Sequence, residues 1–203
     1  MRKINLGILL SIIVLASLTC YLVIIEISRN DDKEEILSIC KEYIQDNIKY
    51  SMLEEKYRTV DKTITDNEFN KYLKEGKEKI DEYLLNDKEI IDIKNKSIEE
   101  KLKYQIINKN VITKLTKSDF KAKEYVFDGD IVVVTIESYA KIERKINGEK
   151  YIDESGAQKY NINDYKKEEP VIDSITFKKV GNKYKIMYDV LVMPMNMGTV
   201  TKW

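Results

Sequence analysis

The N-terminal part of the chain is an apolar run that predicts a membrane-spanning helix. Residues 4–25 include no charged side chain. A helix over this run is about 33 Å long, enough to cross a hydrocarbon core of roughly 30 Å. Arg2 and Lys3 precede the run, and positive residues favour the cytoplasmic side of a membrane. The predicted parts are a cytoplasmic N-terminus at residues 1–3, a single transmembrane helix over residues 4–27 and an extracytoplasmic domain over residues 28–203.

Two other fates of the apolar run stay open, and both concern the residues around Cys20. A bacterial lipoprotein signal would acylate Cys20, but the leucine before it is displaced by one position and Thr19 replaces the usual small residue. A secretory signal would be cleaved after small residues, yet the apolar run continues to Ile25. We therefore interpret the run as a retained anchor and keep Cys20 as a weak candidate for lipidation.

The segment after the run repeats apolar residues every four positions, which predicts a helix with one apolar face. The repeat consists of Ile36, Cys40, Ile44, Ile48 and Met52. Asp32 and Glu35 resemble a capping box, so this helix either begins there or continues the membrane helix as a stalk. Cys40 is interpreted as a small core residue, with an intermolecular disulfide as the alternative. Cys20 cannot pair with it from inside the bilayer.

A second helix is predicted after a loop at residues 58–67. Thr65 and Glu68 have the spacing of a capping box. Apolar or small residues then follow at positions 69, 73, 76, 80 and 83–84, with spacings of four and three. Asn86 and Asp87 are turn formers, so the predicted helices occupy about residues 31–86.

After about residue 100 the spacing of apolar residues changes from helical to alternating, which predicts strands. Alternation begins at Leu102, Tyr104 and Ile106 and continues to a strand with a bulge over residues 120–127. The predicted hairpin turns lie at Asp128-Gly129, Asn147-Gly148 and Gly181-Asn182, and a polar loop covers residues 153–170. Helices followed by an antiparallel sheet at about residues 100–197 define an α+β domain.

This order of elements and the last hairpin resemble the nuclear transport factor 2-like superfamily. The similar residues are Phe177, the Tyr184-Lys185-Ile186 run and Asp189, and the hairpin FDGDIVVV resembles the central hairpin of that family. The resemblance covers about residues 33–195. It implies two or three helices packed on a curved antiparallel sheet that forms a cone. Its enzymes use an acid–base pair in a pocket, but no residue here matches that pair by motif.

A membrane helix that leads into such a domain resembles two bacterial groups. One is the assembly component of conjugative and type IV secretion systems. The other is a set of anchored or lipidated envelope proteins of low-GC Gram-positive bacteria. Both resemblances imply contacts with other proteins outside the membrane.

Composition excludes several classes of function. The 35 basic and 35 acidic side chains cancel, so no net field attracts nucleic acid. The absence of histidine removes the commonest general base and zinc ligand. The chain has no nucleotide-binding, hydrolase or metalloprotease motif. We expect neither catalysis nor a cofactor.

Two sets of residues are candidates for ligand chemistry. Tyrosines on predicted strands could line a sugar or peptide pocket on the concave face of the sheet, namely Tyr125, Tyr139, Tyr184 and Tyr188. Met193, Met195 and Met197 alternate, so their thioethers share one face of an extended chain and suit Cu(I). An adaptable apolar contact explains the methionines equally simply, so they are weak copper candidates. Asp128 and Asp130 are interpreted as hairpin residues rather than calcium ligands.

The sequence thus favours a single-pass protein of the cell membrane whose exterior domain acts as a non-catalytic module for protein–protein interaction or assembly. Its expected partner is an envelope protein, with a second copy of the chain as one candidate. A small-ligand-binding envelope protein or lipoprotein is the alternative, and Cu(I) binding at the methionines is a weaker one.

Overall fold

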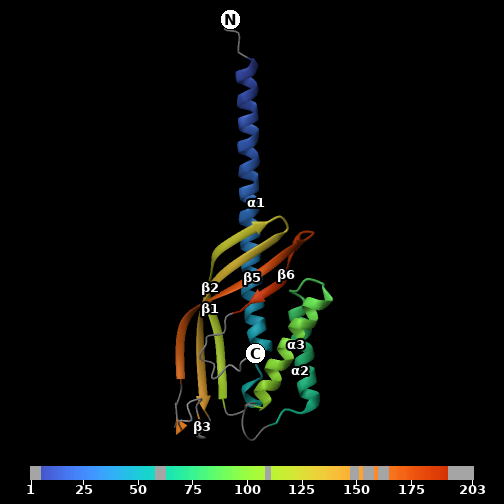
Figure 1. Ribbon diagram of the computed structural model, residues 1–203, viewed down its shortest axis with the longest axis vertical. Helices are drawn as coiled ribbons and strands as arrows, with labels where there is room; N and C mark the ends of the chain where they lie inside the picture. Colours follow the sequence, from blue (N-terminus) through green and yellow to red (C-terminus); the bar gives the residue numbers. More distant parts are fainter. Residues whose placement is uncertain are drawn as a thin grey trace. The chain divides into compact units, whose positions relative to one another are not determined.

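The computed structural model describes residues 6–57, 63–107, 111–146, 151–152, 158–159 and 165–191. The chain divides into two compact units, Met1–Ser38 and Ile39–Trp203. In the first unit the described chain is entirely helical. The second unit contains helices and an antiparallel sheet, which confirms the α+β class predicted for this part of the chain (Figure 1).

Helix α1 is the first element and runs without interruption over Leu6–Tyr50. No proline or glycine occurs between residues 8 and 50, so nothing in the backbone stops the helix. The capping-box pattern at Asp32 therefore does not start a new helix, and the alternative of one continuous helix is confirmed. Within the described residues we find no helix with an apolar stretch long enough to cross a membrane.

Helix α2 covers Asp66–Asp81 and begins at the predicted capping box. The Glu68 N–H donates to Thr65 Oγ1 at 3.3 Å, and the Thr65 N–H donates to Glu68 Oε2 at 3.0 Å. These hydrogen bonds, with that of the Thr65 backbone first, lower the pKa of Glu68. Gly76 faces α1 so closely that an added Cβ would lie 3.1 Å from the Tyr50 Cβ. Glycine thus allows α2 to approach the end of α1.

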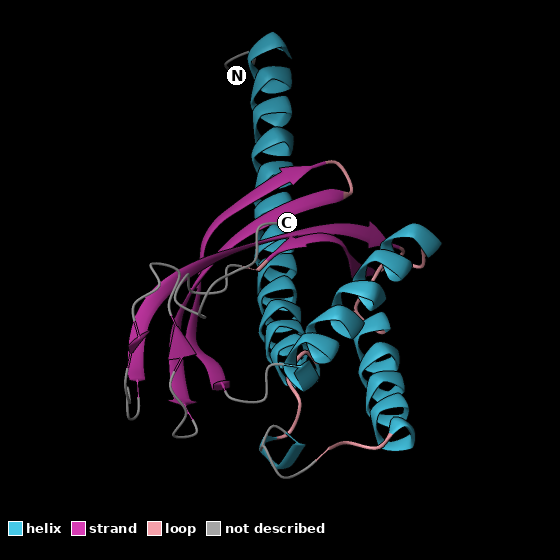
Figure 2. Cartoon of the chain, turned by 60° about the horizontal axis from the view of Figure 1, so that its bottom comes forward, coloured by secondary structure: helices cyan, strands magenta, loops and turns pink. Residues whose placement is uncertain are grey.

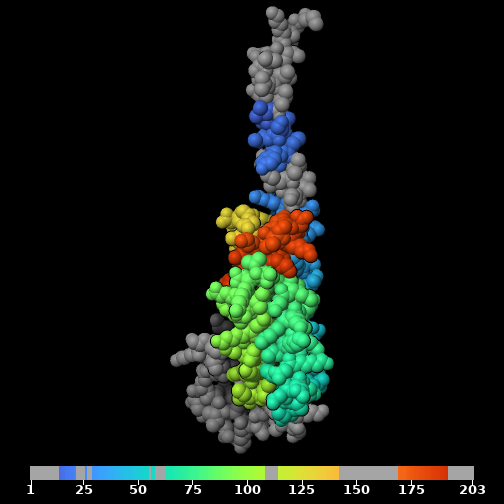
Figure 3. All heavy atoms as spheres, turned by 90° about the vertical axis from the view of Figure 1, so that its right-hand side faces the viewer, coloured from blue at the N-terminus to red at the C-terminus, as the bar shows by residue number. Residues whose placement is uncertain are grey.

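Helix α3 covers Lys88–Ile107 and corrects the prediction that the sheet begins near residue 100. Asp87, read from the sequence as a turn residue, accepts the N–H of Glu89 at 2.9 Å and so caps this helix. Ile98 and Leu102 are buried four residues apart, on one face of the helix. Figure 3 shows α2 and α3 side by side, and the Lys77–Glu99 ion pair joins them at 3.0 Å.

Four long strands form one antiparallel sheet in the order β1-β2-β5-β6. They are β1 (Val111–Asp128), β2 (Ile131–Ile146), β5 (Tyr165–Val180) and β6 (Lys183–Val190). The predicted turns at Gly129 and Gly181 are confirmed, with φ of 60° and 62°, where a type II′ turn needs glycine first. The strands β3 (Tyr151–Ile152) and β4 (Gln158–Lys159) pair with each other, and β4 lies within the predicted polar loop. That loop was predicted to reach residue 170, but β5 already begins at Tyr165. Asn147 and Gly148 lie outside the described residues.

The inner face of the sheet and the helices share the core of the second unit. Every second residue of β2 from Val132 to Ala140 is buried, as expected for a strand with one covered face. Figure 2 shows the long strands curving across the C-terminal part of α1, with α2 and α3 beside it. The buried residues that the helices add are Cys40, Tyr43, Ile44, Ile48, Leu73, Ile80, Ile98 and Leu102.

The edge formed by β6 is covered by the chain itself. Leu84 pairs with Ile186 in a parallel bridge. The Leu85 N–H donates to the Ile186 carbonyl at 2.8 Å, and the Ile186 N–H donates to the Tyr83 carbonyl at 2.9 Å. The segment that follows α2 is thereby fixed to the sheet.

Candidate interaction surface

The outer face of the sheet, opposite the core, exposes apolar side chains from all four long strands. We call five of these residues the outer-face cluster, and each is between 47% and 65% exposed. They are Val126, Tyr139, Ile172, Tyr188 and Val190.

Strand alternation and one bulge place these side chains. Tyr139 faces outward because its neighbours Ser138 and Ala140 face the core. In β6 the pairing shifts between Thr176 and Phe177, which leaves Met187 as an extra residue. Tyr188 consequently lies on the outer face and Asp189 on the inner face.

The cluster is distributed over four successive rows of paired residues on one face of the sheet. One row of paired residues crosses all four strands, from Val126 to Val133, Thr176 and Tyr188. Val190 lies in the next row, Ile172 in the row after it and Tyr139 in the fourth. Successive rows are two residues apart along a strand, or about 6.6–6.8 Å.

A charged pair lies within this surface. Lys123 Nζ is 3.0 Å from Glu137 Oε2, and Glu137 is paired directly with Ile172. The surface therefore combines exposed apolar side chains with one ion pair between them.

The structure divides the four candidate tyrosines between the two faces. Tyr139 and Tyr188 belong to the outer-face cluster. Tyr125 is half-buried on the inner face, stacks on Phe127 with ring centroids 6.2 Å apart, and has a pKa raised by burial. Tyr184 is buried against Phe177, with ring centroids 6.4 Å apart. The four side chains therefore do not line one surface together.

The inner face contains a buried ion pair that sequence reasoning missed. Lys117 Nζ lies 2.7 Å from both carboxylate oxygens of Asp173, and the two side chains are 1% and 0% exposed. Burial lowers the pKa of Lys117, while Asp173 acts in the opposite direction. The detectable signal was a charged residue at an inward position of each alternating strand.

Cys40 lies near this pair and is a buried, free cysteine, as predicted for a core residue. Burial, together with the negative charge of Asp173, raises the pKa of its thiol. The thiol is therefore protonated at neutral pH and a poor nucleophile.

A second set of polar contacts joins α1, α3 and β6. Lys94 Nζ lies 2.8 Å from Asp189 Oδ2 and 5.2 Å from the centroid of the Tyr43 ring. Burial, assisted by Asp189, raises the pKa of Tyr43. Burial also lowers the pKa of Lys101, which faces the positive charge of Lys94. Because the bulge in β6 turns Asp189 inward, it also makes the ion pair with Lys94 possible.

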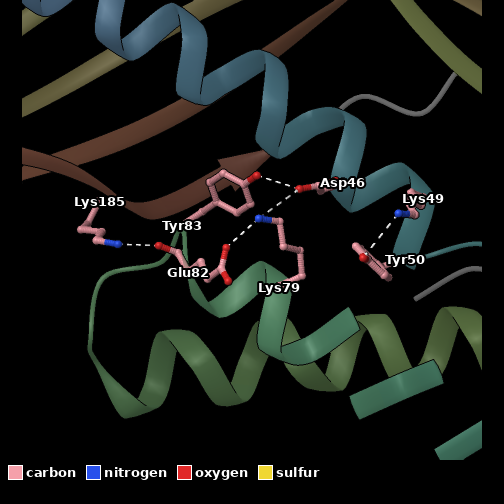
Figure 4. A network of polar contacts seen from close by, with 7 residues as sticks. All are labelled: Asp46, Lys49, Tyr50, Lys79, Glu82, Tyr83 and Lys185. Atoms are coloured by element: carbon pink, nitrogen blue, oxygen red, sulfur yellow. Dashed lines mark hydrogen bonds and ion pairs between the residues drawn. The ribbon is translucent and has the colours of Figure 1, made fainter. Parts of the chain in front are cut away.

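A third polar group connects α1 and α2 to β6 (Figure 4). The Tyr83 hydroxyl donates to Asp46 at 2.7 Å, and Lys79 Nζ lies 2.6 Å from Glu82. Lys185 donates to the backbone carbonyl of Glu82. Burial raises the pKa of Tyr83, and the hydrogen bond to Asp46 adds to this effect. These contacts stabilise the packing of the helices on the sheet and leave the outer face free of them.

Other candidate features do not form a ligand site in the described part of the chain. An open depression at the start of α3 is lined by Asn86, Asp87, Lys88, Glu89, Asp92 and Ile93, and by none of the candidate tyrosines. Within the described ranges, no group of three or more acidic or cysteine residues could hold a metal ion. Met193, Met195 and Met197 lie outside the described residues, and Cys20 is exposed on α1.

Compared with protein-family models, with curated proteins and with solved structures, the chain matches none of them. The element order and the sheet topology define the class of the protein, which is an α+β domain with helices on the inner face of a curved antiparallel sheet.

Proposed function

We propose that this protein is a membrane-anchored, extracytoplasmic and non-catalytic module for protein–protein interaction or assembly in the bacterial cell envelope. The observation that carries the proposal is the outer-face cluster. Single exposed apolar residues are ordinary on protein surfaces, but five of them on one face of a sheet favour an interaction site. Tyrosine in particular is enriched at such sites.

The non-catalytic part of the proposal rests on the state of the ionisable groups in the second unit. Lys117 is held by Asp173, and Lys94 by Asp189. A general acid or base would need a reachable proton near neutral pH. The buried Cys40 thiol has a raised pKa and does not meet this requirement.

The anchor part of the proposal rests on the first unit. Residues 4–25 are free of charge, and all eight consecutive side chains from Val14 to Tyr21, which together cover the circumference of α1, are exposed. Exposed apolar side chains on all sides of a helix suit a lipid environment. The positive residues at positions 2 and 3 orient the N-terminus toward the cytoplasm.

The relationship to known groups is part of the same proposal. Helices on the inner face of a curved antiparallel sheet agree with the resemblance to the nuclear transport factor 2-like superfamily. On that basis the protein would belong with the secretion-system assembly components or with the Gram-positive envelope proteins that share an anchor and such a domain.

Site-specific photo-crosslinking in native membranes tests the proposal. A photoreactive residue at Tyr188 or Ile172 should give a discrete crosslinked product of defined mass. The matched control is Lys71 on α2, whose side chain is 79% exposed. Products at the two outer-face positions and none at Lys71 would support the proposal. Equal products at all three positions, or none at the outer face, would contradict it.

A further inference from the structure

The ion pair between Lys117 and Asp173 crosses the sheet rather than joining neighbouring strands. Lys117 is on β1 and is paired with Ala140, whereas Asp173 is on β5 and is paired with Ile136. The line between the two charged groups therefore passes over β2 at Ser138. Ser138 and Ala140 are the small residues on this side of β2, so they leave space for the long lysine side chain.

Such a buried pair is an inefficient way to gain stability. Both charges lose their hydration, and well-packed apolar residues of similar volume often stabilise a protein as much or more. The best-attested use of a buried polar pair is to select one register or arrangement among several. This raises the question of which arrangement needs selection here.

The apolar pattern of β1 specifies its register weakly. Between residues 114 and 118, Leu115 and Lys117 face inward, and Lys114, Thr116 and Ser118 face outward. Each set contains one lysine, so only the apolar side chain of Leu115 favours the observed orientation of the strand, with Leu115 and Lys117 toward the core. A slip of one residue turns every side chain to the other face, and a strand with such a pattern is prone to it.

The backbone of β1 provides a site where a slip can be absorbed. The pairing with β2 shifts between Ser118 and Lys121, and Asp119 in this bulge has a φ of 53°. A second shift follows between Ala122 and Glu124. Since β1 already contains extra residues at two places, a different position of the bulge would produce a different register of residues 111–118.

We infer that Lys117 and Asp173 act together as a register pin, which fixes the pairing of β1 with β2 before the bulge. A slip of one residue in either direction turns Lys117 to the outer face. Asp173 would then stay buried but lose its ion pair with Lys117, so the slipped arrangement is disfavoured. The pin is a conformational device of the fold and does not depend on the proposed function.

Disulfide trapping in the full-length chain tests the register pin. Thr116 and Lys141 are paired across β1 and β2, and Val133 and Thr176 are paired across β2 and β5. Two cysteine variants, T116C/K141C and V133C/T176C, are made with Cys20 replaced by serine. After denaturation, the thiols that have not formed a disulfide are labelled with a maleimide polymer. The gel shift of the labelled chains then gives the fraction that is crosslinked. Both pairs should crosslink almost completely, since paired positions have suitable Cα distances.

In the decisive comparison, K117M/D173L is introduced into both cysteine variants and removes the ion pair. The T116C/K141C yield should fall at least twofold, while the V133C/T176C yield stays unchanged. An unchanged T116C/K141C yield would overturn the inference, because the register would then be set without the ion pair. Loss of both crosslinks would also overturn it, because the pair would then be required for folding as a whole.

Discussion

Tyr184 and Tyr188 lie four residues apart on β6 and face opposite sides of the sheet. An even spacing in a regular strand would place both on one face. The extra residue Met187 reverses the alternation, so Tyr184 is 4% exposed and Tyr188 is 65% exposed. The same bulge turns Asp189 inward to Lys94. One backbone irregularity thus supplies both a core ion pair and an exposed tyrosine.

Substitution of these two tyrosines should separate stability from surface chemistry. Tyr184→Ala removes a buried ring and should lower the free energy of unfolding by about 3 kcal/mol. Tyr188→Ala should change it by less than about 0.5 kcal/mol, as exposed positions usually do. Urea unfolding of the full-length chain measures both. Similar losses for the two variants would show that the assignment of faces is wrong.

Much of the fold follows from local sequence signals. The Thr65–Glu68 box and the turns at Gly129 and Gly181 were predicted because each depends on neighbouring residues. The bulge expected within residues 120–127 occurs between Ala122 and Glu124. It keeps Tyr125 on the inner face, as the apolar pattern indicated.

Features that depend on distant residues were not predictable in this way. The alternation of Leu102, Tyr104 and Ile106 resembles a strand, but the segment belongs to α3, in which Leu102 is buried in the core. The bulge at Met187 has no sequence signal of its own. The candidate tyrosines were therefore placed on strands correctly, but their faces required the register of all four strands.

The capping box of α2 should contribute measurably to stability. Thr65→Ala removes the acceptor of the Glu68 N–H and should lower the free energy of unfolding by about 1 kcal/mol. Asn67→Ala, an exposed change in the same turn, is the control and should have little effect. Urea denaturation of the two variants makes the comparison. If Asn67→Ala costs as much as Thr65→Ala, the cap hydrogen bond is not the cause.

The contact between α2 and α3 should depend on pH through Glu99. Hydrogen bonds from Lys103 and Lys77 lower the pKa of Glu99 below its usual value of 4.5. The folded protein therefore binds this proton less readily than the unfolded chain. The contribution is complete above about pH 4.5 and is lost as the pH falls through the lowered pKa.

Comparison with Glu99→Gln measures this effect. The variant should be slightly less stable than the native chain at pH 7, by less than about 1 kcal/mol for such a partly exposed pair. The difference should shrink as the pH falls below about 4.5 and through the lowered pKa of Glu99. Glu75→Gln is the control, because Glu75 lies 3.9 Å from Lys71 in an exposed pair. A difference that does not change over the whole acid range in which the domain stays folded would contradict the assigned role of the carboxylate.

Removing one partner should lower the free energy of unfolding by different amounts for the two ion pairs of the inner face. Lys117→Met removes the ion pair of the fully buried Asp173 carboxylate, which should lower the free energy of unfolding by about 3–5 kcal/mol. Lys94→Met should cost about 2 kcal/mol, because the Lys94 and Asp189 side chains are 11% and 14% exposed and water can reach the carboxylate. Denaturant titration gives both values. Equal costs would mean that burial does not set the penalty.

A charge placed in the outer-face cluster should abolish association without unfolding the domain. Ile172 is 53% exposed, so the ammonium group of Ile172→Lys stays in water and the free energy of unfolding should change by less than about 0.5 kcal/mol. A lysine introduced within the contact surface must lose water on binding, which disfavours the complex. The crosslinked product from a photoreactive residue at Tyr188 should therefore fall at least tenfold. Lys71→Glu on α2 changes charge at a distant exposed site and should leave the yield unchanged. A normal yield from Ile172→Lys, in a domain shown to be folded, would exclude the outer-face cluster as the contact surface.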